Sequence, residues 1–387
     1  MVNAVLAPTL AAEFGLSASG LGLLSSVYFL AFAVVQLPVG LALDRFGPRR
    51  VNAALLLVAV AGGALFASAE SAPVAIAARA LIGLGVSACL MAALTAFVLW
   101  YPPERISTMT GVAFSAGAVG AMTVTVPLEL LLRAWGWREA FMLIVGVTLA
   151  LSLVFWLWVP ERSARRQGEG WREILQGLRE LLRDPVFLRL AIPLGASQSA
   201  AVALQTLWAA TWLRDVAGWA PAGVAQGLLA INASMIAGYL AFGRAADAWQ
   251  RRGRSPLPLL AGGVALSSLS LGLIILGVHT ILLWCLFVGA GTGVVLAYSI
   301  LARRYPKAMA GRVNTAVNVV GFVGMFAGQW AIGLVLDLWP PTERGYAAEA
   351  YPWAFGMVWA AQLAGLAWLW RGRTLFAEPA MGAPPAR

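Results

Sequence analysis

The stretch GLALDRFGPRR, residues 40–50, places charged side chains and glycines between two long apolar segments. The residues before it contain one acidic side chain, that of Glu13, and neither Lys nor Arg. A second apolar run follows the stretch directly. Short charged loops between such segments are typical of a chain that leaves a membrane, turns and enters it again.

The composition of the whole chain agrees with this interpretation. Of 387 residues, 60% are hydrophobic and 11% are charged, whereas soluble domains contain about 25% charged residues. The net charge of +10 lies in short clusters beside apolar runs, so it does not indicate a nucleic-acid partner. The composition therefore predicts an all-α polytopic membrane protein whose main partner is the lipid bilayer.

Eleven runs are long enough to cross a hydrocarbon core of about 30 Å as helices. They are Leu21–Leu43, Val51–Ala69, Pro73–Trp100, Ile106–Leu132, Ala140–Val159, Val186–Leu213, Pro221–Ala246, Leu257–Val278, Ile281–Ala302, Val313–Leu336 and Pro352–Trp370. The first residues, Met1–Phe14, are apolar but too short for a span. We interpret them as the back half of a truncated first helix whose front half is absent.

The basic residues predict the orientation of the spans. Placing the 40–50 loop in the cytoplasm and alternating the spans leaves only four basic residues outside, Arg133, Arg138, Arg214 and Arg344. Under the positive-inside rule this bias predicts a multi-pass protein of the bacterial inner (plasma) membrane, with both termini cytoplasmic.

The longest polar interval, Pro160–Pro185, divides the chain. It contains GWREILQGLRELLRD at residues 170–184, with leucines at helical spacing and charges opposite, which predicts an amphipathic helix on the inner membrane surface. We therefore expect a six-helix bundle over residues 1–159, a cytoplasmic linker over 160–185, a second six-helix bundle over 186–370 and a cytoplasmic tail over 371–387.

The two predicted bundles repeat each other in sequence. Gly40-x-x-x-Asp44 has a counterpart in Gly243-x-x-x-Asp247, and Tyr101-Pro102 has one in Tyr305-Pro306. Matches in the same order argue for a duplicated six-helix unit, and parallel repeats are a known plan for transporters.

With these residues in view, the chain resembles a transporter of the major facilitator superfamily over its whole length. The loop residues Gly40, Asp44, Arg45, Gly47 and Arg49 fit that family's signature after the second span, although Pro48 stands where a basic residue is usual. RALIGLGVSA, from Arg79, fits a second signature in the fourth span. The resemblance implies two pseudo-symmetric bundles, six plus six, that rock to alternate access to a central cavity.

We expect the 40–50 loop to act as a gate. Gly40 allows a neighbouring helix to approach closely, Gly47 allows a tight reversal, and Asp44 gains energy beside a helix N-terminus. The resemblance suggests that this N-terminus is that of the eleventh span, near Arg312. In the alternative interpretation, the charges of the loop only set the topology.

Further gate contacts are expected around the same loop. Arg45 and Arg49 are expected to pair with Glu104. Asp247, with Gly243, is expected to repeat the arrangement at the fifth span near Arg105.

Polar residues inside the cavity-lining spans are the candidates for substrate binding. Arg79 stands first, because a guanidinium inside a span is costly and usually functional. It is either a substrate-anion clamp or coupling group, or a structural Arg that bonds backbone carbonyls at a helix contact. The other candidates are Tyr28, Gln36, Gln198, Gln205, Trp208, Trp212, Asn232, Tyr298 and Asn318.

Four of these residues have the spacing of one helix face: Gln198, Gln205, Trp208 and Trp212. Amides and indoles together suit a binding pocket, but they serve equally as packing and hydrogen bonding between helices. Glu129 is the candidate for proton coupling, unless it only pairs with Arg133.

The leading function is therefore secondary active transport of a small metabolite, with an anion such as a carboxylate or short peptide as one possibility and a co-transported proton or ion left open. The alternative is export of drugs or amphiphiles, and a non-transporting sensor is the third choice. No nucleophile motif or metal-ligand cluster favours an enzyme, and no cofactor is expected. Gly83-x-Gly85 and Gly289-x-Gly291 lie within spans, where they favour close packing over phosphate binding. We expect a monomer.

Overall fold

The computed structural model describes residues 2–100, 134–160, 179–305, 310–342 and 345–372, with a few isolated positions between 116 and 131 and at 176–177. All regular elements in these ranges are helices, apart from one isolated bridge between Thr342 and Gly345. Most of the predicted fifth span, of the linker and of the tail lies outside the described residues.

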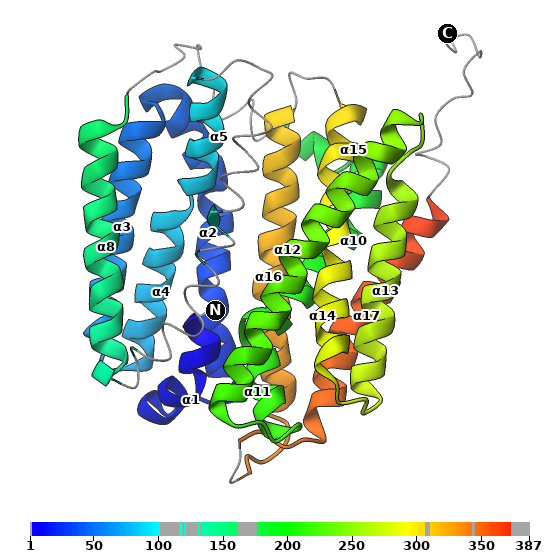
Figure 1. Cartoon of the computed structure of the whole chain (residues 1–387). Helices are drawn as coiled ribbons and strands as arrows, with labels where there is room; N and C mark the ends of the chain where they lie inside the picture. The colour runs from blue at the N-terminus through cyan, green and yellow to red at the C-terminus, as the bar shows by residue number, and fades with distance from the viewer. Residues whose placement is uncertain are drawn as a thin grey trace, which may run out of the picture.

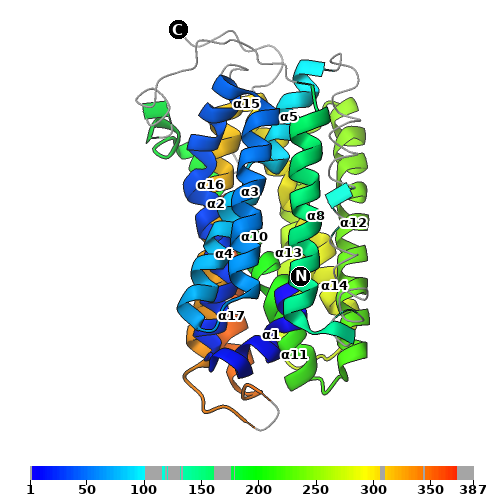
Figure 2. The ribbon, with the colours of Figure 1, turned by 90° about the vertical axis from the view of Figure 1, so that its left-hand side faces the viewer.

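The N-terminal part of the chain forms a group of helices that pack on each other, here called the N-terminal bundle (Figure 1). Its helices are α1 (Val2–Phe14), α2 (Ala18–Phe46), α3 (Pro48–Ala67), α4 (Ala72–Val86), α5 (Cys89–Trp100) and α8 (Trp137–Trp158). Helices α4 and α5 together form one predicted span, which is interrupted at Ser87 and Ala88. Figure 2 shows α3 and α8 running side by side along the long axis of this bundle.

The C-terminal part forms a second group, here called the C-terminal bundle. Its elements are α10 (Pro185–Ala203), η1 (Leu204–Trp208), α11 (Ala209–Asp215), α12 (Pro221–Arg251), α13 (Leu257–Ile275), α14 (Ile281–Gly291), η2 (Thr292–Val295), α15 (Leu296–Arg304), α16 (Ala310–Leu336) and α17 (Ala350–Arg371). Two of its spans change helix type midway, because η1 is a π-helical turn and η2 is a 3-10 turn. Such irregular turns inside helices often mark functional positions.

The helix boundaries follow local chemistry. The side chains of Ser17, Asp184 and Thr280 accept hydrogen bonds from the first backbone amides of α2, α10 and α14. Gly47 joins α2 to α3 with a φ of 83°, a left-handed value that favours glycine, as the tight reversal predicted. In the described ranges nine helices are long and apolar enough to cross a membrane, and all nine fall on predicted spans.

The sequence repeat is also a repeat of contacts between helices. In the N-terminal bundle, Gly83 lies against the backbone of Tyr28 on α2, and Gly85 lies against that of Ala59 on α3. In the C-terminal bundle, Gly289 lies against Ser234 on α12, and Gly291 lies against Ser267 on α13.

Each glycine pair therefore fits its helix between the second and third spans of its own bundle. The predicted packing role of these glycines agrees with the geometry, and equivalent helices occupy equivalent places in the two bundles.

This packing predicts a strong effect of adding one methyl group. Gly85→Ala places a Cβ into the backbone of Ala59, so we expect a loss of about 1–3 kcal/mol in stability and a lower melting temperature in detergent. Gly146→Ala in α8 is the control, because nothing lies within 4 Å of the added carbon. Equal melting temperatures for the two variants would contradict the packing.

Candidate functional site

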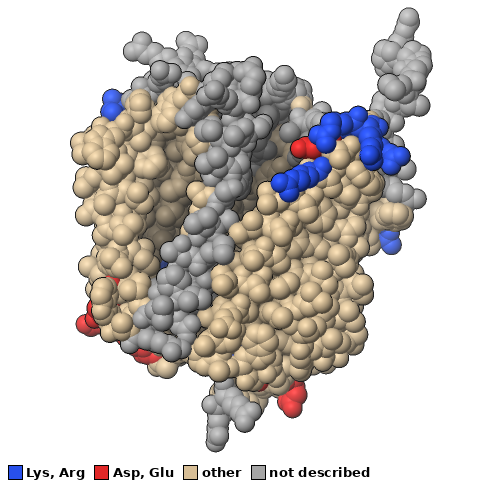
Figure 3. Space-filling view, viewed as in Figure 1, with Lys and Arg blue, Asp and Glu red and all other residues tan. Residues whose placement is uncertain are grey.

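The two ends of the molecule differ in charge. One end, here called the basic end, carries the loop after α2 and the turn after α12, with Arg45, Arg50, Arg251 and Arg252 exposed. The opposite end, here called the far end, carries Asp337 and Glu349, together with Glu13 and Asp215, which pair with Arg138 and Arg214. In Figure 3 most blue side chains lie at the basic end with a red one beside them, the other red ones lie at the far end, and the surface is hollowed between the bundles.

At the far end the two bundles touch along α2 and α16, which form the longest contact between the bundles in the described part of the chain. Two glycines allow the close approach. A Cβ on Gly22 would lie 2.9 Å from the carbonyl oxygen of Gln329, and one on Gly333 would clash with the backbone of Ala18. The far end is therefore closed by direct backbone contact between the bundles.

Asp337 adds a polar bond to this contact. It follows α16 directly, and its two carboxylate oxygens accept from the backbone amides of Ala18, at 2.7 Å, and Ser19, at 2.9 Å. These amides open α2, so a carboxylate of one bundle caps a helix of the other and interacts favourably with its dipole.

The protonation of Asp337 follows from the same contacts. Partial burial acts to raise its pKa, but the hydrogen bonds from Ser19, Ser17 and Ala18 outweigh burial and hold the pKa below its ordinary value. A lowered pKa means that this stabilisation is present above the ordinary pKa of an aspartate. It is lost only as the pH falls through the lowered value, so the contact persists at neutral pH.

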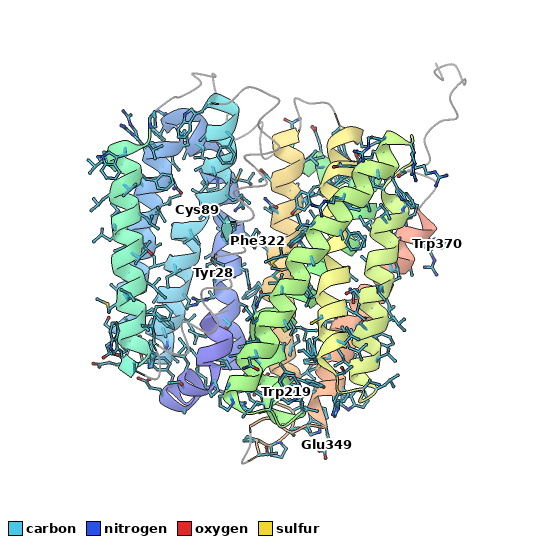
Figure 4. The ribbon with its side chains drawn as sticks, in the orientation of Figure 1. Tyr28, Cys89, Trp219, Phe322, Glu349 and Trp370 are labelled. Carbon is cyan, nitrogen blue, oxygen red and sulfur yellow. The ribbon has the colours of Figure 1, made fainter. Side chains whose placement is uncertain are left out.

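An aromatic layer lies above the far-end contact. The ring of Phe322 on α16 lies 4.2 Å from Phe32 and 6.2 Å from Phe29, both on α2. Tyr28 extends the layer, with its ring 5.3 Å from Phe29. Figure 4 shows Tyr28 and Phe322 on the two sides of the boundary between the bundles.

Towards the basic end, two of the predicted gate glycines have no close neighbour among the described residues. Nothing lies within 4 Å of a Cβ built on Gly40, although this glycine was predicted to permit a close helix contact. Gly243, its counterpart on α12, is equally open. Gly40 and Gly243 therefore make no close helix contact among the described residues, whereas the backbones of the two bundles approach closely at the far end.

The charged gate residues can be placed only in part. The guanidinium of Arg45 lies 5.3 Å from the Phe46 ring, and that of Arg49 lies 5.9 Å from the Trp156 ring on α8. Asp247 is exposed on α12. The side chains of Asp44 and Arg312, and all of Glu104 and Arg105, lie outside the described part, so their predicted contacts stay predictions.

Arg79 lies in α4, against aromatic rings. Its guanidinium carbon is 5.5 Å from the Tyr28 ring centroid and 5.9 Å from that of Phe66. Its Nε is buried and has no hydrogen-bond partner among the described residues, none of which offers it a carboxylate within 4 Å. Through Tyr28, this cation is linked to the aromatic layer between the bundles.

Three predicted residues meet in the C-terminal bundle. The hydroxyl of Tyr298 on α15 donates to Oδ1 of Asn318 on α16 at 2.8 Å, and the amide of Gln198 on α10 hydrogen-bonds to the same hydroxyl. All three side chains are partly exposed. This neutral polar cluster joins α10 to α15 and α16, two helices that lie far from it in sequence.

The residues of the predicted face, Gln198, Gln205, Trp208 and Trp212, meet different neighbours. Gln198 lies against α16, whereas Gln205, in the π-helical turn η1, hydrogen-bonds to α12. There the Gln205 amide donates to Oδ1 of Asn232 at 2.9 Å, and the Asn232 amide donates to the carbonyl of Leu228 at 2.7 Å. This buried pair joins two helices within the C-terminal bundle.

The two tryptophans of the predicted face lie in packed surroundings. Trp208 is fully buried, donates to the carbonyl of Gln329 at 3.1 Å and packs beside Gly22, so it belongs to the far-end contact. Trp212 is buried against Trp284 and His279. Neither indole lies with the Gln198 cluster.

Two further candidates complete the set. Gln36 on α2 is 1% exposed, and neither end of its amide has a hydrogen-bond partner within the described ranges. Such an orphaned buried amide is costly, which fits a side chain that awaits a ligand or a change of conformation. Glu129, the coupling candidate, lies outside the described residues.

The sequence interpretation missed two carboxylates. Asp337 was not singled out, although it follows α16 much as Asp44 closes α2. Asp215 was not singled out either; its buried side chain pairs with Arg214 at 2.5 Å and accepts from the Tyr351 hydroxyl at 2.8 Å. It thereby fastens the end of α11 to the start of α17, and only the fold reveals that neighbourhood.

Comparisons with known proteins agree with the geometry. The sequence profile of the family described as Major Facilitator Superfamily matches residues 1–329. A probable sulfoacetate transporter of Cupriavidus necator is 28% identical over 271 residues, which are 67% of this chain and 57% of the relative. A chloramphenicol resistance protein of Streptomyces lividans is 29% identical over 258 residues, 66% of this chain and 63% of the relative. The chain thus spans less than two thirds of either relative.

Among solved structures, a bacterial homologue of the human lysosomal transporter Spinster, in an inward-facing and occupied conformation, superposes with a TM-score of 0.77. The alignment covers 96% of this chain and 92% of that one, at 16% identity. This likeness confirms the predicted fold class.

Variants of Gln205 and Asn232 test whether this pair stabilises the fold or serves to bind substrate. Asn232→Ala leaves the buried Gln205 amide with the weak sulfur acceptor of Met235 at 3.4 Å, so we expect a loss of about 1–3 kcal/mol in stability, seen as a lower melting temperature in detergent. Replacing both residues by Leu removes both polar groups and is expected to restore most of that loss. A double variant less stable than the single one would count against a purely structural role of the pair.

Proposed function

Because this chain belongs to the Major Facilitator Superfamily, we propose that it is a secondary active transporter that carries a small organic anion across the bacterial inner membrane. The family match favours a transporter over an enzyme. Substrate crosses as the bundles rock about the aromatic layer, so that the hollow opens at one end while the other is closed. In this conformation the far end is closed.

The proposal that the substrate is an anion rests on the surroundings of the Arg79 guanidinium. A guanidinium inside a membrane span needs a counter-charge or strong hydrogen-bond acceptors. Here it has aromatic faces, an unpartnered Nε and no carboxylate among the described residues within 4 Å. A carboxylate or sulfonate of the substrate would supply the missing acceptor, and the similarity to a probable sulfoacetate transporter supports such an anion.

Orientation and gating complete the proposal. The basic end is assigned to the cytoplasm by the positive-inside rule, which makes the present conformation open towards the cytoplasm. When the basic end closes, Asp44 meets the N-terminus of α16 near Arg312. The similarity to a chloramphenicol resistance protein makes export of an aromatic drug the second candidate, and the aromatic layer around Phe322 would suit it.

Replacing Arg79 tests the anion site. In proteoliposomes, with and without a pH gradient, sulfoacetate and related small carboxylates are the first probes and chloramphenicol is the comparison. Arg79→Gln removes charge-assisted hydrogen bonds worth about 1.5–3 kcal/mol, so we expect the Kd for the transported anion to rise about tenfold to a hundredfold.

The control for this test is Arg189→Gln. That guanidinium also lies on an indole, 3.9 Å from the Trp368 ring centroid, but near the basic end of α10. We expect the Arg189→Gln protein to bind the anion with an affinity within about twofold of the parent value, since Arg189 makes no contact with substrate in the proposal. Unchanged anion binding in Arg79→Gln would refute the assignment, and transport of chloramphenicol alone would favour the second candidate.

Replacing Asp44 tests the gate. Asp44→Asn keeps the size of the side chain but removes the charge that would meet the helix dipole, so we expect slower uptake with unchanged expression and membrane orientation. Glu180→Gln, an exposed carboxylate that accepts from Gln176, serves as the control and should transport normally. Normal uptake by Asp44→Asn would leave the loop with a topological role only.

A further inference from the structure

Helices α2 and α16 run antiparallel and touch in the aromatic layer, at Phe32 and Phe322. From Phe32 to Asp44 and from Phe322 back to Ala310, the first residue of α16, the chain covers the same twelve residues. Each arm is therefore about 18 Å long at 1.5 Å per residue. If the two helices touched along these arms, Asp44 would lie at the N-terminus of α16.

On the far-end side of the aromatic layer, the segments of α2 and α16 are also nearly equal in length. Phe32 lies fourteen residues after Ala18, the first residue of α2, and Phe322 lies fifteen residues before Asp337. On this side the helices do touch, and the carboxylate at the end of α16 reaches the first amides of α2. The pair thus has an acid near the C-terminal end of each helix and, opposite it, the N-terminus of the other helix.

We propose that Asp337 is the far-end latch of the transport cycle: its carboxylate caps α2 while the far end is closed, and it releases α2 as Asp44 caps α16 at the basic end. This inference rests on the proposed alternating access and adds a gate residue at the far end. The two caps are expected to alternate, because rocking about the aromatic layer would part α2 from α16 at one end as it brings them together at the other.

Helix α2 can lose its contact with Asp337 and still keep a capped N-terminus. The hydroxyl of Ser17 accepts from the amide of Gly20, so the helix keeps a cap of its own when Asp337 withdraws. The amides of Ala18 and Ser19 lie at the end of the helix, where water can replace the carboxylate. The latch therefore biases the position of the bundles and is not needed for folding.

A reporter for far-end opening is available on α2. Residues of α2 that meet α16 fall at Ala18, Gly22, Phe29 and Phe32, and Ser25 continues this stripe at helical spacing. Ser25 is 3% exposed, and its hydroxyl has no partner among the described residues. Ser25→Cys is nearly isosteric, and its thiol becomes reachable from the far side only when α2 and α16 part there.

The experiment measures how fast a membrane-impermeant maleimide, applied from the far side, labels Ser25→Cys. The background carries Cys89→Ser and Cys285→Ser, which removes both native thiols. Adding Asp337→Asn takes away one charged helix cap, and we expect labelling to speed up about fivefold to thirtyfold. Ser19→Ala, which weakens the same contact without removing a charge, is expected to give a smaller increase.

Two controls separate release of the latch from general loosening. Glu349→Gln removes an exposed far-end carboxylate at the start of α17 and should leave labelling of Ser25→Cys unchanged. Ser152→Cys reports on the interior of the N-terminal bundle, where the native hydroxyl donates to the carbonyl of Ala53 at 2.9 Å. Its labelling should not respond to Asp337→Asn.

Unchanged labelling of Ser25→Cys in both the Asp337→Asn and Ser19→Ala proteins would overturn the proposal. Equal acceleration at Ser25→Cys and Ser152→Cys would overturn it too, because the carboxylate would then only hold the fold together. The readout needs no substrate. Failure of the proposed anion transport therefore shows itself in the Arg79 assay, separately from failure of the latch.

Discussion

The direct contact between α2 and α16 is the constraint on which the other features depend. In lipid, two helices gain little from hydrophobic burial, so close contact needs small residues that let backbones meet. Gly22 and Gly333 provide this at the far end, and Asp337 adds a charged cap. Towards the basic end α2 carries Pro38 and Gly40, and the Cβ position of Gly40 has no neighbour within 4 Å among the described residues. This helix pair thus holds the far end closed.

The rest of each bundle serves as a rigid body around this pair. The glycine pairs of α4 and α14 lock each helix between its two neighbours at backbone distance, which leaves little freedom for sliding inside a bundle. The Asp215 cluster fastens the far end of the C-terminal bundle in the same way. In the proposed cycle, motion is then concentrated between the bundles, where the described contacts include an aromatic layer and a helix cap.

Much of this fold could be predicted from the sequence, because a span needs about twenty apolar residues and the charged loops are plain. The close packing of Gly83 and Gly85 was predictable for a similar reason, since glycines inside a span have few other uses. The π-helical turn at Leu204–Trp208 was not predictable from spacing. The neighbours of this span were not predictable either, since Gln205 hydrogen-bonds to α12 while Gln198 lies against α16. Asp337 was overlooked because its partner, Ala18, is some 320 residues away in the chain.

The asymmetry of the two bundles bears on the substrate. Aligning the glycine pairs places Cys285 at the position of Arg79, and Ser234 at the position of Tyr28. The duplicated unit therefore keeps its backbone contacts but carries a cation on an aromatic ring in one bundle and small neutral groups in the other. In the proposal, a substrate held between them would meet the charge of Arg79 on one side and, among the described residues, the hydrogen-bonding cluster of Gln198, Tyr298 and Asn318 in the opposite bundle. That arrangement favours a molecule with one anionic end and one neutral polar end over a symmetric dianion, because a second charge would be buried without a counter-charge.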